Sequence, residues 1–322
     1  MSGHADPSTL PALAEDRRAC RRLLREGSKS FYAASVLLPP RVRDDAGAVY
    51  GWCRVADHAV DRTDRPAEAL ESIRAGLERV YVGRPKGAVE RAFADAVFRH
   101  RISRDIPEAM LEGFEWDVTG RRYANLSEVI DYCVRVGSTV GAMMTTVMER
   151  RDPETLSAAC RLGVAMQLTN IARDVGEDAR TGRLYLPLDS LEEAGVVPDV
   201  WLASPAAVDG IRASVNGLLD DADDLYAAAW PGIERLPPRC RPAIRAAALV
   251  YAEIGRKVRD ADCDSVSQRA WTGKAEKARL LARSLGRRPG AWTRSGRADI
   301  ESPSVKLADA SALFLVEAVH GS

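Results

Sequence analysis

Residues Gln167–Pro187 read QLTNIARDVGEDARTGRLYLP, a stretch that carries two carboxylates among apolar residues, amides and arginines. Apolar residues recur at intervals of three and four, which predicts an amphipathic helix. Asp174 and Asp178 are four residues apart, so a helix brings them to one face, where like charges repel each other. Such a pair indicates either a bound cation or a solvated surface. The rest of the chain has to distinguish these two interpretations.

The same helical periodicity runs through most of the chain, while alternating strand patterns are hard to find. It predicts helices over residues 14–28, 44–61, 66–81, 89–100, 106–120, 127–148, 154–175, 207–230 and 241–262. No fixed repeat and no Gly/Ser-rich linker divides them, so we expect one all-α domain over residues 14–285. Residues 1–13 are expected to form a flexible N-terminus. Residues 286–322 are expected to form a mobile C-terminal tail that ends in a short helix at 306–319.

The composition excludes several classes of protein. Lys+Arg and Asp+Glu both number 46 in the 322 residues, so the basic excess of a nucleic-acid-binding protein is absent from the sequence. Six scattered cysteines without a C-x-x-C pair are typical of reduced thiols in a cytosolic protein. The first residues have no apolar core like that of a signal peptide, and no run reaches the length of a membrane span. We therefore expect a soluble or peripheral cytoplasmic protein.

A second carboxylate pair lies at Asp57 and Asp61, again four residues apart, with Arg54 on the same helical side. One such pair proves little, because charged helix faces are common. The chain also offers a comparison, since Asp220 and Asp224 have the same spacing in LLDDADDLY. Only acids and small apolar residues surround that pair, which predicts a solvated face.

The sequence neighbours of Asp174 differ from those of Asp220 and Asp224. Gln167, Asn170 and Asp174 form one helical stripe, and Arg173, Arg183 and Tyr185 lie nearby in the sequence. Carboxylates from two helices can hold a hard cation such as Mg²⁺, and arginines bind the phosphate oxygens that the cation also binds. The residues therefore predict a Mg²⁺–diphosphate site between two helices of an all-α bundle. Ionisation of an allylic diphosphate needs such a site beside an apolar cavity that shields the carbocation from water.

The sequence lacks the motifs of several other enzyme classes. The chain has no P-loop, no H-E-x-x-H zinc motif and no G-x-S-x-G elbow, and its four histidines are scattered. The stretch GSTVG at Gly137–Gly141 misses the hydrolase pattern and favours close packing between helices instead.

Four stretches together resemble the squalene/phytoene synthase family: GSKSFYAASVLLP (27–39), YGWCRVADHAVD (50–61), VGSTVGAMM (136–144) and the stretch 167–187 quoted above. The residues of the first two stretches, together with LEGFEWDVTGRRY (111–123), are most similar to those of the bacterial phytoene synthases. The resemblance implies a single-domain helical bundle of the class I isoprenoid synthase type with a central active-site cavity. It also implies head-to-head condensation of two geranylgeranyl diphosphates, through prephytoene diphosphate, to phytoene, the first committed step of carotenoid biosynthesis.

The resemblance also implies roles for individual residues. It assigns Mg²⁺, with Mn²⁺ as a substitute, to the carboxylates Asp57, Asp61, Asp174 and Asp178. It assigns a catalytic role to these four and to Tyr123. It assigns substrate binding to Ser28, Ser30, Arg54, Gln167, Asn170, Arg173, Arg183, Tyr185, Tyr251 and Arg269. His58 departs from the family pattern, which usually has a second acid at this position, and makes the first motif less acidic.

Three alternatives stay open. The chain could be a squalene or dehydrosqualene synthase that uses farnesyl diphosphate, and a chain-elongating prenyltransferase is less favoured because its first motif normally reads D-D-x-x-D. A membrane-associated scaffold without activity would have lost metal-binding aspartates, and all four are present. For phytoene formation, no nicotinamide cofactor is expected. The implied partners are two geranylgeranyl diphosphates, a transiently contacted membrane surface and a phytoene desaturase that takes over the product.

Four small residues bear on the length of the substrate tail. Small residues at Ala34, Ser35, Ala46 and Gly47 follow Ser28 in the sequence and are consistent with a deep apolar tunnel for a twenty-carbon tail. On periodicity alone, they fit close helix packing equally well.

Overall fold

The computed structural model describes residues 12–61, 63–286 and 302–321, and every regular element within these ranges is helical. The elements are α1 (Ala14–Gly27), α2 (Lys29–Ser35), α3 (Pro40–Asp61), α4 (Pro66–Tyr81), α5 (Gly87–His100), α6 (Asp105–Val118), α7 (Leu126–Cys133), the π-helical η1 (Val134–Ser138), α8 (Thr139–Val147), α9 (Pro153–Arg180), α10 (Leu188–Glu193), α11 (Pro198–Ala203), α12 (Asp209–Arg235), α13 (Arg241–Asp260), α14 (Lys274–Ser284) and α15 (Pro303–His320). The prediction of an all-α fold is confirmed. Helices α10, α11 and α14 were not predicted.

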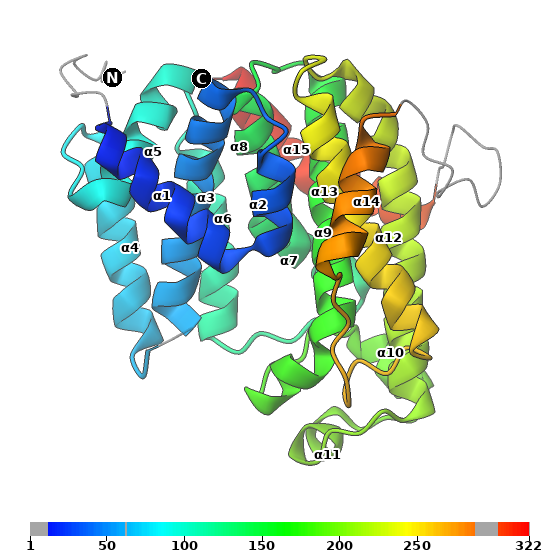
Figure 1. Ribbon diagram of the computed structural model, residues 1–322. Helices are drawn as coiled ribbons and strands as arrows, with labels where there is room; N and C mark the ends of the chain where they lie inside the picture. Colours follow the sequence, from blue (N-terminus) through cyan, green and yellow to red (C-terminus); the bar gives the residue numbers. More distant parts are fainter. Residues whose placement is uncertain (1–11, 62, 287–301, 322) are drawn as a thin grey trace.

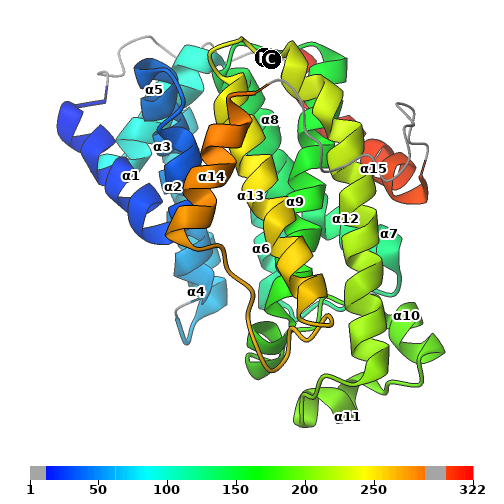
Figure 2. The same ribbon diagram turned by 45° about the vertical axis from the view of Figure 1, so that its right-hand side comes forward.

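The 28-residue helix α9 lies at the middle of the bundle, beside α12 and α13 in both views (Figures 1 and 2). Helices α8, α12, α13 and α15 and the segment η1 pack around it. The side chain of Asp152 caps its start by accepting a hydrogen bond from the backbone of Thr155, and Pro153 occupies its first position. Gly182, with φ +75°, forms the turn that ends it. Asp174 and Asp178 therefore lie in its last two turns.

Glycines allow α9 to approach the α7–η1–α8 segment very closely. A Cβ on Gly137 would lie 2.6 Å from the carbonyl oxygen of Gly163, and a Cβ on Gly141 would lie 2.6 Å from that of Ala159. No side chain fits at such a backbone contact. This geometry confirms that GSTVG serves close helix packing.

The helix predicted over 127–148 is interrupted by η1, which the sequence pattern did not indicate. A π-helical turn inserts one extra residue into a helix and shifts the faces that follow it. Here Ser138 Oγ also donates to the carbonyl oxygen of Cys160 on α9, at 2.8 Å. Val136 and Val140, in and just after η1, both line the interior cavities of the bundle.

The short helix predicted at 306–319 is confirmed as part of α15, but the predicted mobility is wrong for residues 303–320, because α15 is packed against the bundle. Ala308, Ala312 and Leu315 are almost completely buried, and α15 packs against α7, α9 and α12. Arg161 on α9 forms a bidentate ion pair with Asp309, with distances of 2.7 and 2.6 Å. Apolar spacing in this helix therefore reflects docking onto the core. The rest of the predicted tail, 287–301, and most of the predicted flexible N-terminus, 1–11, lie outside the described residues.

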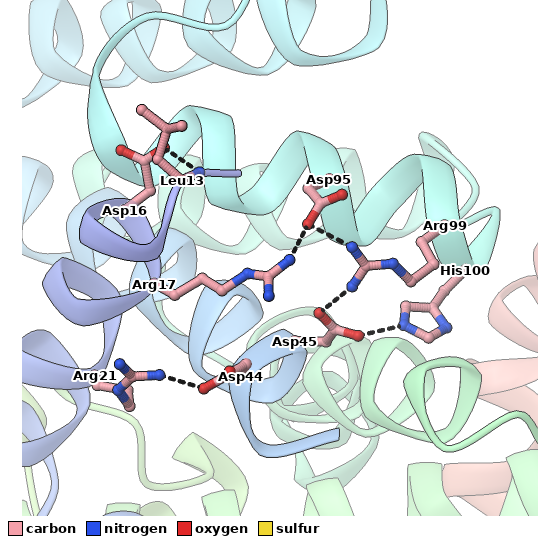
Figure 3. Close-up of polar contacts among 9 residues, drawn as sticks. All are labelled: Leu13, Asp16, Arg17, Arg21, Asp44, Asp45, Asp95, Arg99 and His100. Carbon is pink, nitrogen blue, oxygen red and sulfur yellow. Dashed lines mark hydrogen bonds and ion pairs between the residues drawn. The ribbon is translucent and has the colours of Figure 1, made fainter. Parts of the chain in front are cut away.

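An ionic network joins α1, α3 and α5 (Figure 3). Arg17 and Arg99 both donate to Asp95, at 3.0 and 2.6 Å, and Arg99 also donates to Asp45 at 2.7 Å. His100 Nε2 lies 2.8 Å from the other oxygen of Asp45. Burial raises the pKa of Asp45, but His100 and Arg99 outweigh it and hold the pKa below its usual value. The network fixes the first helices around the amino-terminal half of α3.

Candidate active site

The first carboxylate pair lies in the last two turns of α3. Asp57 and Asp61 share one face, and Arg54 Nη1 lies 2.5 Å from Asp57 Oδ2. Burial raises the pKa of Asp57, and the nearby charge of Asp61 raises it further. The ionised pair is therefore in an environment that a bound cation would stabilise.

The second pair lies in the last two turns of α9. Arg173 and Arg269 both place Nε 2.7 Å from Asp174 Oδ1, although Arg269 comes from the connection between α13 and α14. Burial raises the pKa of Asp174, but the two guanidinium groups outweigh it and lower the pKa overall. Burial and the charge of Asp174 raise the pKa of Asp178 to about 7. One carboxylate of the pair is thus neutralised by arginines, and the other has no comparable partner in the residues described.

Both pairs line one cavity of about 280 Å³, called the polar cavity below. Arg183, in the loop after α9, links them: its Nη2 lies 2.8 Å from Asp61 Oδ1, and its backbone N–H donates to the carbonyl oxygen of Asp178 at 2.9 Å. Arg54, Gln167, Asn170 and Tyr185 also line this cavity. The structure thus brings residues from two distant segments to one place, as the sequence predicted.

Asp117 on α6 is a cavity residue that sequence reasoning missed. Tyr185 donates to its Oδ1 at 2.6 Å, and Tyr132 donates to its Oδ2 at 3.0 Å. Burial raises the pKa of Asp117 to about 6, although both tyrosine hydroxyls oppose this shift. Asp117 has no second acid four residues away, so the pair pattern could not find it. Its position inside an apolar helix was the available signal.

Tyr123 does not lie where its predicted catalytic role requires. Its side chain is fully buried behind Tyr132 and Tyr185, with ring centroids 5.4 and 6.1 Å away, and it lines neither cavity. The catalytic assignment is therefore corrected: Tyr123 supports the two tyrosines that bond to Asp117. Its signal in the sequence was a local motif, and a local motif does not determine which ring reaches the cavity.

Ser28 and Ser30 also stay outside both cavity linings. Ser28 caps α2, because its Oγ accepts a hydrogen bond from the backbone N–H of Phe31 at 3.1 Å. The structure therefore does not place these serines at either cavity, and the capping interpretation explains Ser28.

An apolar cavity of about 260 Å³ adjoins the polar one. The two share Tyr50, Cys53, Val136, Val140, Gln167 and Asn170 in their linings, so these side chains form the junction between them. Tyr251 lines the apolar cavity, as do Ala34, Ser35 and Ala46. Gly47 does not: a Cβ there would meet Arg21 of α1 at 3.9 Å, so the prediction that it lines the tunnel is wrong.

The polar cavity suits a hard divalent cation that keeps part of its water shell. Asp57, Asp61, Asp174 and Asp178 line the same space, and burial together with the neighbouring carboxylate raises the pKa of Asp57 and of Asp178. Within the described part of the chain, no three acidic, histidine or cysteine side chains converge into a closed metal site. Mg²⁺ is typically held by one or two carboxylates, waters and substrate phosphates, so an open donor set of this kind fits it.

The comparison pair behaves differently. Asp220 lies outside both cavities with its side chain 47% exposed, and its Oδ1 accepts a hydrogen bond from Arg259 at 2.9 Å. Its partial exposure on α12 agrees with the predicted solvated face, whereas the ion pair with Arg259 was not predicted.

Comparisons with known proteins agree on one family. The profile described as "Squalene/phytoene synthase" matches residues 24–279. A phytoene synthase of Rhodobacter capsulatus is 50% identical over 273 residues, which cover 84% of this chain and 80% of that protein. A 15-cis-phytoene synthase of a Paracoccus species is 40% identical, covering 80% of this chain and 87% of that protein. The solved structure of a dehydrosqualene synthase in complex with a ligand is 30% identical with a TM-score of 0.76, covering 84% and 95% of the two chains.

Proposed function

The chain belongs to the squalene/phytoene synthase family, and we propose that it joins two molecules of geranylgeranyl diphosphate head to head to form phytoene. It is a prenyltransferase, and phytoene synthase is the function of its relatives with 40 to 50% identity. The observation that carries the proposal is the polar cavity with two facing carboxylate pairs, which opens onto an apolar cavity. The polar cavity suits a diphosphate, and the apolar cavity suits a polyprenyl tail.

In this proposal, Asp57, Asp61, Asp174 and Asp178 hold Mg²⁺, with Mn²⁺ as a substitute. The bound metal supplies electrostatic stabilisation of the departing diphosphate. Arg54, Arg173, Arg183 and Arg269 already lie at these carboxylates, where their N–H groups can donate to diphosphate oxygens. Asp117 orients the hydroxyl of Tyr185 toward the same cavity.

The apolar cavity accounts for the second requirement of the reaction. Loss of the first diphosphate allows a carbon–carbon bond to form between the two chains, giving prephytoene diphosphate and releasing a proton. Loss of the second diphosphate and of one more proton then gives phytoene. Val136, Val140 and the apolar wall around Met144 and Met166 exclude water, which would otherwise trap the carbocation.

Squalene or dehydrosqualene formation from farnesyl diphosphate is not favoured, because the curated relatives with the highest identity given above are phytoene synthases. An inactive scaffold is not favoured either, since the four aspartates and their arginine partners form a complete set.

The proposal is tested by incubating the full chain with radiolabelled geranylgeranyl diphosphate and Mg²⁺, followed by lipid analysis. We expect phytoene without added nicotinamide cofactor, and no product when EDTA is present. Farnesyl diphosphate serves as the competing substrate. A chain that converts farnesyl diphosphate at least as efficiently as the longer substrate would contradict the proposal.

Substrate length gives a separate prediction. Ser35 lines the apolar cavity, so Ser35→Phe is expected to place a ring in the space of the longer tail. It should lower kcat/KM for geranylgeranyl diphosphate at least about tenfold more than for farnesyl diphosphate, a ratio typical of apolar pocket discrimination. Val36→Phe is the control, because Val36 is exposed and outside the cavity. Equal losses on both substrates would mean that Ser35 does not limit tail length.

We also propose that the protein works in the cytoplasm and docks weakly on membranes. Within the described residues, no helix is both long and apolar enough to cross a bilayer. Phytoene is highly apolar, and Val197, Val200 and Trp271 are exposed large apolar side chains that could contact lipid. The same incubation run with phospholipid vesicles tests this: the protein should co-sediment in part and be released by high salt and alkaline washing. Retention after both washes would contradict peripheral docking.

A further inference from the structure

The connection between α13 and α14, residues 261–273, lies directly against α9 at Gly176. The backbone N–H of Gly176 donates to the carbonyl oxygen of Ser265 at 2.9 Å. A Cβ on Gly176 would lie 2.4 Å from the carbonyl oxygen of Val266 and 2.8 Å from its Cα. Only glycine fits such a contact between a helix and a backbone segment without moving one of them. We call residues 261–273 the strap.

Gly176 lies halfway between the two carboxylates of the second pair. In a helix with 3.6 residues per turn, Asp174 and Asp178 share a face, and the residue midway between them points to the opposite side. The strap therefore covers the back of the helical turn whose front carries the carboxylates. A shift of the strap at this point would act on the site without occupying it.

The strap also supplies Arg269. The guanidinium of Arg269 makes a bidentate contact with Asp174, at 2.7 and 3.2 Å, and its Nε lies 3.2 Å from Glu177. Arg173, the other arginine that contacts Asp174, lies on α9 itself. Arg269, by contrast, comes from a segment with no regular structure. Its position therefore depends on how the strap is held.

Several hydrogen bonds hold the strap at Val266, three residues before Arg269. Arg180 Nη2 donates to the carbonyl oxygen of Val266 at 3.2 Å. Asp264 Oδ1 accepts from the backbone N–H groups of Val266 and Ser267, at 3.2 and 2.9 Å. The backbone groups of residues 268–272, all of them described, take part in no further hydrogen bond. The contact of Ser265 and Val266 with α9 is thus the hydrogen-bonded backbone anchor nearest to Arg269, while Ala270 beside it packs against the hydrophobic core.

We propose that Gly176 and Arg180 are positioning residues, which seat the strap so that Arg269 reaches Asp174; this rests on the proposed function of the site. A methyl group at Gly176 would have to push the strap away by about 1 Å to restore an ordinary contact distance. A displacement of this size at a charged catalytic group can lower a rate about 10²-fold. Neither residue has to touch the substrate for this effect.

The first test is a double-mutant cycle on kcat/KM with geranylgeranyl diphosphate. Gly176→Ala should lower kcat/KM about 10²-fold. Gly217→Ala, the same change on an open part of α12 with nothing within 4 Å, should change it less than about twofold. In an Arg269→Ala background, Gly176→Ala should lower kcat/KM less than about threefold further, because the group it displaces is already missing. Effects that multiply in full, or normal kcat/KM in Gly176→Ala, would overturn the proposal.

The second test measures how firmly the strap is held against α9 in the absence of metal and substrate. Hydrogen–deuterium exchange of peptides from 261–273 in the metal-free protein should be at least about tenfold faster in Gly176→Ala than in the unchanged protein. Arg180→Met, a change at an exposed residue, should move the exchange in the same direction and serves if Gly176→Ala does not fold. Unchanged exchange in the folded variants overturns the proposal whatever the activity. A strap that loosens as expected in a protein that makes no phytoene would instead count against the proposed function.

Discussion

Asp174→Asn is expected to lower kcat at least about 10³-fold, equivalent to about 4 kcal/mol of transition-state stabilisation. The change preserves shape but removes the charge at the polar cavity, and it replaces one of the two oxygens that accept from Arg173 and Arg269 with an NH2 group that cannot accept. An amide is a poor ligand for Mg²⁺ compared with a carboxylate, so the diphosphate would lose both its metal and its ordered arginines. Steady-state turnover with saturating Mg²⁺ measures the effect, and circular dichroism verifies folding. Asp57→Asn should behave in the same way.

Asp220→Asn is the matched control, since it makes the same chemical change in a carboxylate pair with the same spacing. Asp220 contacts Arg259 and Asn216 at the surface of α12. Exposed pairs of this kind contribute about 0 to 1 kcal/mol to stability, so activity should stay within about twofold. If Asp220→Asn proved as damaging as Asp174→Asn, the distinction between the acidic clusters would be wrong.

Gly163→Ala is expected to destabilise the fold by about 3 kcal/mol. Its Cβ would lie 2.7 Å from the backbone carbonyl of Gly137 and from the Cα of Ser138, and neither helix can move without disturbing the core. Overpacking against backbone is relieved only by moving whole elements, here α9 relative to η1. Urea unfolding followed by circular dichroism measures the loss.

Gly217→Ala again provides the comparison, because the same substitution on an exposed, open part of α12 should slightly stabilise the protein, by about 0.5 kcal/mol. Equal stability of the two variants would show that the close crossing of α9 and η1 is not a tight constraint on the fold.

Local sequence patterns were sufficient to predict much of the fold and of the carboxylate pairs. Apolar residues at helical spacing predicted an all-α bundle, and the spacing of four placed Asp57 with Asp61 and Asp174 with Asp178. The small residues of GSTVG predicted a close helix crossing, which Gly137 and Gly163 form. These predictions succeeded because they depend on the geometry of a single helix or on the absence of a side chain, and a sequence shows both directly.

Tertiary structure decided which faces meet. Arg269 reaches Asp174 although the two are 95 positions apart in the sequence, and Asp117 joins the cavity from a helix with no acidic pair. The side chain of Tyr123 lies in the core rather than in the cavity, and Gly47 faces α1.

The predicted tail illustrates the same physical reason. Residues 303–320 carry an apolar face whose stability comes from burial against α7, α9 and α12, and not from the helix alone. Helical periodicity fixes which residues share a face, but the rotation and neighbours of each helix follow from packing the whole chain. The sequence therefore determined the helices, the carboxylate pairs and the family, and packing decided which side chains complete the site.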